Sequence, residues 1–176
     1  MGGHNKWSQI KRQKGANDAA KSRVWAKLSR RLTVESKKAN GETDAANVRS
    51  VVETARKENM PKDAIERAIS RGTTADAGSL ESILCECYGP GGAAIMISCL
   101  TDNKNRTLQE VKGIFAKHDI ALAAPGSALW AFDKTADGYV PKTIVPLSEN
   151  DDAALTKVME LIDALDDVES VFTNAA

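Results

Sequence analysis

Basic side chains are concentrated at the start of the chain, where they are suited to bind the phosphates of a nucleic acid. Residues 1–72 carry 17 Lys and Arg against 8 Asp and Glu, whereas residues 73–176 carry 7 against 16. Within residues 1–38, 11 basic side chains are opposed only by Asp18 and Glu35. Because Lys and Arg neutralise phosphates and release counterions, this pattern predicts a basic module for a polyanion. In the alternative interpretation, the two oppositely charged halves pack against each other.

The candidate nucleic-acid contacts lie in an N-terminal arm and in the helix predicted to follow it. They are Lys6, Trp7, Lys11, Arg12, Lys14, Lys21, Arg23, Arg30 and Arg31. The indole ring of Trp7, next to Lys6, is suited to stack on an unpaired base. Alternatively, Trp7 and Ile10 fold back onto the helices, which still leaves the lysines around them free to bind phosphates.

A second candidate site is the polar segment Thr101–Thr107, between a predicted strand and a predicted helix. Its candidate contacts are Asn103, Asn105 and Arg106. The free backbone N–H groups at a helix N-terminus attract anions, which favours a binding role. Equally, this segment can be a capping loop in which Asn and Asp side chains satisfy the backbone.

Three cysteines and two histidines are the residues best suited to bind a metal, but their spacing does not favour one. Cys85 and Cys87 point to the same face of a predicted strand, and Cys99 lies in the next strand. Structural zinc sites use a loop-borne Cys-x2-Cys spacing and a fourth ligand, which neither His4 nor His118 is placed to provide. We therefore expect buried, small hydrophobic cysteines, with no metal and no cofactor.

Motifs for catalysis are not found either. The carboxylate pairs Asp151-Asp152 and Asp166-Asp167 fit a helix's first turn and a polar turn, and Gly89–Gly92 joins two predicted strands without the Lys-Ser/Thr of a phosphate-binding loop. The sequence thus predicts a protein that is not an enzyme. A small-molecule sensor or an enzyme remains the third alternative, since α+β folds often bind metabolites.

The arm, residues 1–15, precedes a predicted helical domain over residues 16–75. Its three helices run from Asn17 or Asp18 to about Ala39, from Asp44 to a stop at Asn59-Met60-Pro61, and from Lys62 to Arg71. We expect Pro61 at the first position of the third helix and Gly72 at its C′ position. Their apolar stripes include Val24, Trp25, Leu28, Leu32, Val48, Val51, Val52, Ala55, Ile65, Ala68 and Ile69.

Beyond a Gly/Ala/Thr/Ser linker, residues 76–176 are predicted to form an α+β domain of ferredoxin-like type. Its sheet is antiparallel or mixed, in the order ββαββαβ. The predicted strands are Ile83–Tyr88, Ala93–Leu100, Ala128–Phe132, Thr143–Leu147 and Val168–Thr173. The predicted helices are Thr107–His118 and Glu149 to Leu165, the second capped by Ser148.

The cellular setting follows from what the chain lacks. No run approaches the roughly 18 apolar residues that a membrane span needs, and the first residues have no apolar signal core. The three cysteines are too few for a disulfide framework. We expect a cytoplasmic protein without a membrane partner.

Five segments of the chain are similar to the YebC/PmpR family, which includes mitochondrial translational activators. They are Gly3–Lys11, Asn59–Ile69, Tyr88–Gly92, Leu100–Thr107 and Leu161–Asn174. The resemblance spans essentially the whole chain, with one departure. Family members typically carry a third domain inserted within the second, whereas here residues 133–140 form only a short connector with Asp137-Gly138 as a turn.

The resemblance implies a regulator that is not an enzyme. Family members have been described as DNA-binding transcriptional regulators and as ribosome-associated translation factors that relieve stalling. Because no dimeric reading helix with Asn, Gln and Arg in register is present, we favour rRNA or tRNA on the ribosome over duplex DNA. Promoter recognition remains the alternative, and the oligomeric state is left open.

Overall fold

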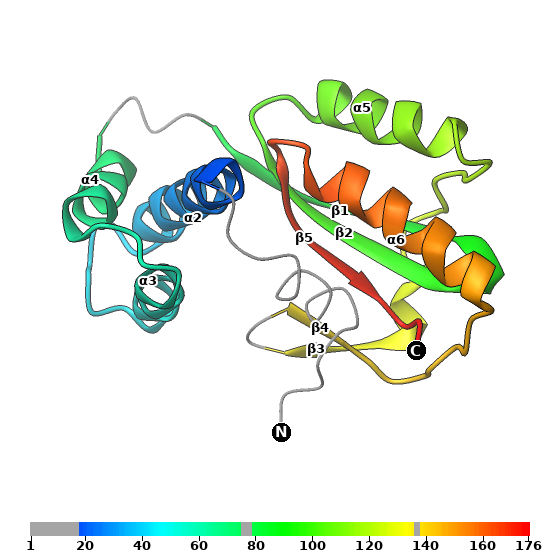
Figure 1. The fold of residues 1–176 in the computed structure, drawn as a ribbon. Helices are drawn as coiled ribbons and strands as arrows, with labels where there is room; N and C mark the ends of the chain where they lie inside the picture. The colour runs from blue at the N-terminus through cyan, green and yellow to red at the C-terminus, as the bar shows by residue number, and fades with distance from the viewer. Residues whose placement is uncertain (1–17, 75–78, 136–137) are drawn as a thin grey trace. The chain divides into compact units, whose positions relative to one another are not determined.

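A computed structural model describes residues 18–74, 79–135 and 138–176, which belong to two compact units (Figure 1). The first contains the helices up to Glu81, and the second contains Ser82–Ala176. The α+β class is confirmed, with a helical region followed by a sheet region. In the described part of the chain, no helix has the length and apolar character needed to cross a membrane.

The helical unit consists of α2 (Asp18–Lys38), α3 (Ala46–Lys57) and α4 (Lys62–Gly72). The predicted stripes form its core, although Trp25 lies at the edge of that core rather than inside it. The buried residues of the central cluster are Leu28, Leu32, Val51, Ala55, Met60, Ile65 and Ala68, and Val48 is buried as well. Burial of these side chains on a shared face is what makes three short helices stable together.

Three predicted helix ends were wrong in detail. Ala45 rather than Asp44 occupies the N-cap of α3, and Pro61 occupies the N-cap of α4 rather than its first helical position. Gly72 is the last residue of α4, not a C′ residue with positive φ. Its lack of a side chain is needed for close packing instead, because an added Cβ would lie 2.6 Å from the carbonyl oxygen of Thr33 in α2.

The sheet unit is built on three strands in the order β1-β2-β5. These are β1 (Glu81–Tyr88), β2 (Ala94–Thr101) and β5 (Val168–Thr173), and β2 pairs antiparallel with β5. The turn between β1 and β2 contains the short 3-10 helix η1 (Pro90–Gly92). One face of the sheet is covered by α5 (Lys104–Ala116) and α6 (Glu149–Asp163), which bury Phe115 and Leu155 against it (Figure 1).

The opposite face of the sheet is covered by a segment, residues 128–132, that was predicted to be a strand and for the most part is not one. The 3-10 helix η2 (Leu129–Ala131) stands where a strand over Ala128–Phe132 was expected. The buried carboxylate of Glu86 accepts hydrogen bonds from the backbone N–H groups of Gly126, Ala128 and Leu129. These groups are therefore turned towards one side chain and cannot form a strand ladder.

The remaining predicted strand was also wrong. In the segment predicted as a short connector, β3 (Phe132–Thr135) and β4 (Gly138–Pro141) pair as an antiparallel two-stranded sheet. Within Thr143–Leu147, only Val145 forms a β-bridge, with Ala175. Pro146 cannot donate to a ladder, so this segment stays a single bridge.

Candidate nucleic-acid interface

The helix α2 carries the predicted basic surface of the helical unit. Lys21 and Arg23 are exposed, whereas Arg30 and Arg31 are half-buried. The helix holds seven basic residues against two acidic ones, and it contains no Asn or Gln. The predicted contacts Lys6, Trp7, Lys11, Arg12 and Lys14 lie outside the described residues.

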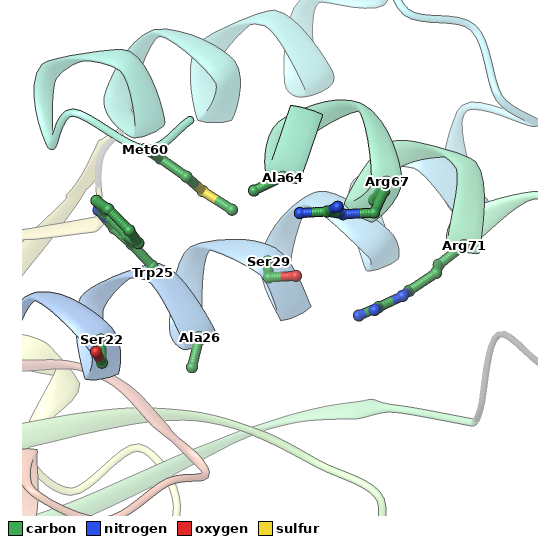
Figure 2. A pocket seen from close by; sticks show the side chains of 8 residues that line it. All are labelled: Ser22, Trp25, Ala26, Ser29, Met60, Ala64, Arg67 and Arg71. Atoms are coloured by element: carbon green, nitrogen blue, oxygen red, sulfur yellow. The ribbon is translucent and has the colours of Figure 1, made fainter. Parts of the chain in front are cut away.

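A hollow between α2 and α4 adds residues that the sequence did not single out (Figure 2). It has a volume of about 360 Å³. Its lining comes from α2, from α4 and from Met60, which lies just before α4. The lining residues are Ser22, Trp25, Ala26, Ser29, Met60, Ala64, Arg67 and Arg71. We call this hollow the α2–α4 groove.

One end of the groove is formed by Trp25 and Met60 (Figure 2). The indole Nε1 of Trp25 donates a hydrogen bond of 3.0 Å to the carbonyl oxygen of Glu58. This bond ties α2 to the end of α3 and orients the ring. Helical periodicity places Trp25 in the apolar stripe, but it does not distinguish a core position from the half-buried edge of the core.

The other end of the groove is cationic. Arg67 and Arg71 are one turn apart on α4, and their side chains reach into the hollow (Figure 2). A nitrogen of Arg67 lies 3.0 Å from the carboxylate of Asp63, but both side chains are about two-thirds exposed. Within the part of the chain that the structure describes, Arg71 forms no ion pair. The spacing of these two arginines at i and i+4 is the feature of the sequence that could have indicated this end of the site, although neither arginine was among the predicted contacts.

The second candidate site, at the start of α5, is organised by contacts inside the sheet unit. The Asn103 side chain accepts a hydrogen bond from the backbone N–H of Arg106, so it caps α5, which begins three residues before the predicted start. The Arg106 guanidinium contacts Asp102 at 2.8 Å and the buried Asp167 at 2.7 Å. Hydrogen bonds to Asp167 and then Asp102 raise the pKa of Arg106.

This arrangement matches the capping alternative for the segment. Thr101 and Thr107 also donate hydrogen bonds to Asp167, at 3.1 and 2.7 Å. The network joins the end of β2, the first turn of α5 and the turn before β5. Asn105 is exposed in that first turn. In this segment, Asn105 is therefore accessible to an anion, whereas the guanidinium of Arg106 is held by two carboxylates.

The three cysteines are buried and free. Burial raises the pKa of Cys87 to about 12, and a hydrogen bond with Cys85 together with burial raises that of Cys99. The same hydrogen bond lowers the pKa of Cys85. Among the described residues, no cluster of three or more His, Cys, Asp or Glu could hold a metal ion.

Comparison with known proteins identifies the class of protein. The profile of the TACO1/YebC protein N-terminal domain matches residues 5–75, and that of the TACO1/YebC second and third domain matches residues 80–137. The two profiles together match most of the sequence. The chain belongs to the TACO1/YebC family.

Curated relatives carry regulatory names. A probable transcriptional regulatory protein of Petrotoga mobilis is 46% identical over 144 residues, which is 81% of this chain and 57% of that protein. Another such protein, from Desulfotalea psychrophila, is 42% identical over 157 residues, covering 88% of this chain and 63% of its own length. The chain thus spans less than two thirds of the length of these relatives.

A solved structure supports the fold. The crystal structure of the conserved hypothetical protein Aq1575 from Aquifex aeolicus matches with a TM-score of 0.80. The match covers 90% of this chain and 91% of that chain, at 24% sequence identity. At this identity the likeness concerns the arrangement of the chain.

Proposed function

We propose that this protein is a nucleic-acid-binding regulator of gene expression that acts without catalysis in the cytoplasm. The observation that carries the proposal is the surface of α2, where exposed Lys21 and Arg23 belong to a helix with seven basic and two acidic residues. The regulatory names of the relatives agree with this role. The basic arm, residues 1–15, would extend the same contact.

Structured RNA, in particular rRNA or tRNA on the ribosome, is the target that we favour. The side chains that discriminate A in duplex DNA are Asn and Gln, and α2 contains neither. Its lysines and arginines are suited to phosphates, whose contacts position a protein without reading sequence. The protein would then act as a translation factor.

Duplex DNA is the second candidate target. It is favoured by the names of the relatives, which are called probable transcriptional regulatory proteins. Arginines of α2 can also bind the edge of guanine in the major groove. A transcriptional regulator would require affinity for a particular promoter sequence in addition to salt-dependent attraction.

We further propose that the chain is a short form of the family. The hairpin of β3 and β4 would stand where longer members carry their inserted third domain. The hairpin register supports this, because Phe132 pairs with Pro141 and so joins the two flanks directly. The matches to the relatives agree with this proposal, because they cover a larger share of this chain than of the relatives' own length.

The proposal is tested by removing charge from α2. The double variant Lys21→Gln/Arg23→Gln is compared with Lys57→Gln/Lys62→Gln, which removes two exposed charges from α3 and α4. Binding to a tRNA and to a duplex DNA is measured by fluorescence anisotropy over a range of KCl concentrations. We expect the α2 variant to reduce the slope of log affinity against log salt by about one for each phosphate that the helix no longer binds.

Each outcome has a defined meaning. A smaller slope for the α2 variant alone, with tighter binding of tRNA, supports an RNA-binding factor. Co-sedimentation with ribosomes that the α2 variant loses supports the translational role. A sequence-specific footprint on duplex DNA supports the second candidate. If the unaltered protein binds neither nucleic acid in a salt-dependent way, the proposal is wrong.

A further inference from the structure

We propose that the α2–α4 groove receives one unpaired nucleotide of a single-stranded nucleic acid. The base would lie against Trp25 and the adjoining phosphate against Arg71 and Arg67. This inference rests on the proposed function, and it adds a specific class of ligand: an unstacked nucleotide rather than a continuous duplex. The groove lies wholly within the helical unit.

The dimensions and floor of the groove fit a ligand of this size. Its volume of about 360 Å³ is at the lower end of the range of about 300–1,000 Å³ that is usual for small-ligand sites. The rest of the lining is made of small side chains, namely Ser22, Ala26, Ser29 and Ala64. Small side chains leave room for a planar ring, and the two serine hydroxyls are suited to bond a sugar or a phosphate oxygen.

The aromatic end has the properties of a stacking platform. Trp25 is half-buried, and its N–H group is already bonded to the carbonyl oxygen of Glu58. The ring is thus held in one orientation before a ligand binds, which lowers the entropy cost of binding. With its polar group in use, the indole offers its apolar surface, and stacking on a base needs nothing more. The buried thioether of Met60 lies at the same end of the groove.

The cationic end has the properties of a phosphate site. Guanidinium groups bind phosphate oxygens in pairs, so Arg71 offers two parallel hydrogen bonds. Arg67 loses little stabilisation when it turns to a phosphate, because its ion pair with Asp63 is exposed to solvent and exposed pairs are weak. An aromatic ring at one end and two guanidinium groups at the other match the base and the phosphate of one nucleotide.

A duplex cannot use this groove in the same way. Bases in a duplex are stacked on their neighbours, and their ring faces are covered. A concave site that contacts a ring face therefore selects nucleotides that are unpaired, as in loops, bulges and single strands. RNA and DNA strands share this chemistry, and the test separates them.

The experiment compares variants of the two ends of the groove in the full-length protein. Arg71→Gln removes the cation, Trp25→Leu removes the ring, and Trp25→Phe keeps a smaller ring. Lys62→Gln is the matched control, because it removes an exposed charge from the same helix outside the groove. Affinities are measured by anisotropy for labelled 12-residue single strands of RNA and DNA and for the corresponding duplexes. Circular dichroism verifies the helical content of each variant.

We expect Trp25→Leu and Arg71→Gln each to weaken the binding of single strands about tenfold, a loss typical of one stacked base or one phosphate contact. Trp25→Phe retains most of the affinity, and Lys62→Gln has little effect on single strands. Duplex binding changes much less in the groove variants. Stronger binding of RNA than of DNA through the same residues would assign the groove to RNA, and equal binding would assign it to single strands in general.

A second measurement leaves Trp25 and Arg71 unaltered, so it does not depend on whether variants at these positions fold normally. In a Trp7→Phe/Trp130→Phe protein, Trp25 is the remaining tryptophan, and stacking on a base should quench its fluorescence. Quenching by single strands but not by duplexes supports the proposal. The proposal is overturned if Arg71→Gln and Lys62→Gln weaken the binding of all nucleic acids to the same extent. It is also overturned if AMP quenches the fluorescence of Trp25 while single strands do not. Because α2 would still bind phosphates in the first case, the proposed function would survive it.

Discussion

The two units use their charged side chains differently. In the sheet unit, Glu86 and Asp167 are each 4% exposed, and their carboxylates accept hydrogen bonds from within that unit. Even the exposed Arg106 is held by Asp102 and Asp167. In the helical unit, described ion pairs such as Lys62 with Glu66 join exposed neighbours on one helix, although Glu35, paired with Lys38, is partly buried. The buried carboxylates of the sheet unit are structural, whereas Lys21 and Arg71 of the helical unit are exposed and open to a ligand.

The difference indicates where a ligand should be sought. A charged group that is bonded inside the fold must lose those bonds before it can bind a partner, whereas an exposed one loses only water. The guanidinium of Arg71 and the ammonium of Lys21 are therefore better candidate contacts than the guanidinium of Arg106. Changes at the internal charges should affect stability, and changes at the surface charges should affect binding.

The largest expected effect is at the internal carboxylate of the sheet unit. Asp167→Ala should lower the free energy of unfolding by about 3 kcal/mol, because Arg106, Thr101 and Thr107 lose a shared partner. Urea unfolding followed by circular dichroism measures it. The control Asp102→Ala removes the other, exposed partner of Arg106 and should cost less than about 1 kcal/mol. Equal losses in the two variants would contradict the distinction between internal and surface charge.

A smaller effect is expected where the helical unit depends on packing rather than charge. Gly72→Ala should destabilise by about 1–3 kcal/mol, because the new methyl group would meet the Thr33 carbonyl and the Ser36 side chain. Gly113→Ala is the matched control in α5, where an added Cβ meets nothing within 4 Å. That change should stabilise by about 0.5–1 kcal/mol through helix propensity. Thermal unfolding reports both, and a neutral result for Gly72→Ala would show that α2 and α4 can move apart.

The smallest effect is expected from the most enclosed carboxylate described in the helical unit. Partial burial raises the pKa of Glu35, but hydrogen bonds from Lys38 and Asn47 outweigh it, so the pKa lies below its ordinary value of 4.5. A lowered pKa in the folded state means that the stabilisation is complete above 4.5 and is lost as the pH falls through the folded-state pKa. Unfolding measured between about pH 6 and pH 3 should show this loss. The loss of stability should be smaller in Glu35→Gln than in the unaltered protein. Identical pH profiles of the two proteins would contradict the lowered pKa of Glu35.

Local patterns predicted the elements well where one interaction dominates. Apolar periodicity located all three helices of the first unit, and Ser148 marks the start of α6, where it accepts a hydrogen bond from the N–H of Asp151. The strand Val168–Thr173 was predicted with the bounds that it has. In each case, the residues that define the element are neighbours in the sequence.

Predictions were wrong where distant residues decide the backbone. The segment Ala128–Phe132 has strand composition, but Glu86, about 40 positions away, binds its N–H groups. Gly72 has the residue type of a helix C′ position, but Thr33 and Ser36 of another helix determine its role. The edge position of Trp25 likewise depends on the carbonyl of Glu58.

The helices, the strands β1, β2 and β5, the charge difference between the two halves and the basic character of α2 follow from the sequence alone, because they depend on composition and on spacing along one chain. Only the tertiary structure decides which cations are available, because a guanidinium is neutralised by whichever carboxylate the fold brings to it. That is why Arg106 is held by Asp167, 61 positions away. It is also why Trp25 and Arg71, 46 positions apart in the sequence, line one groove.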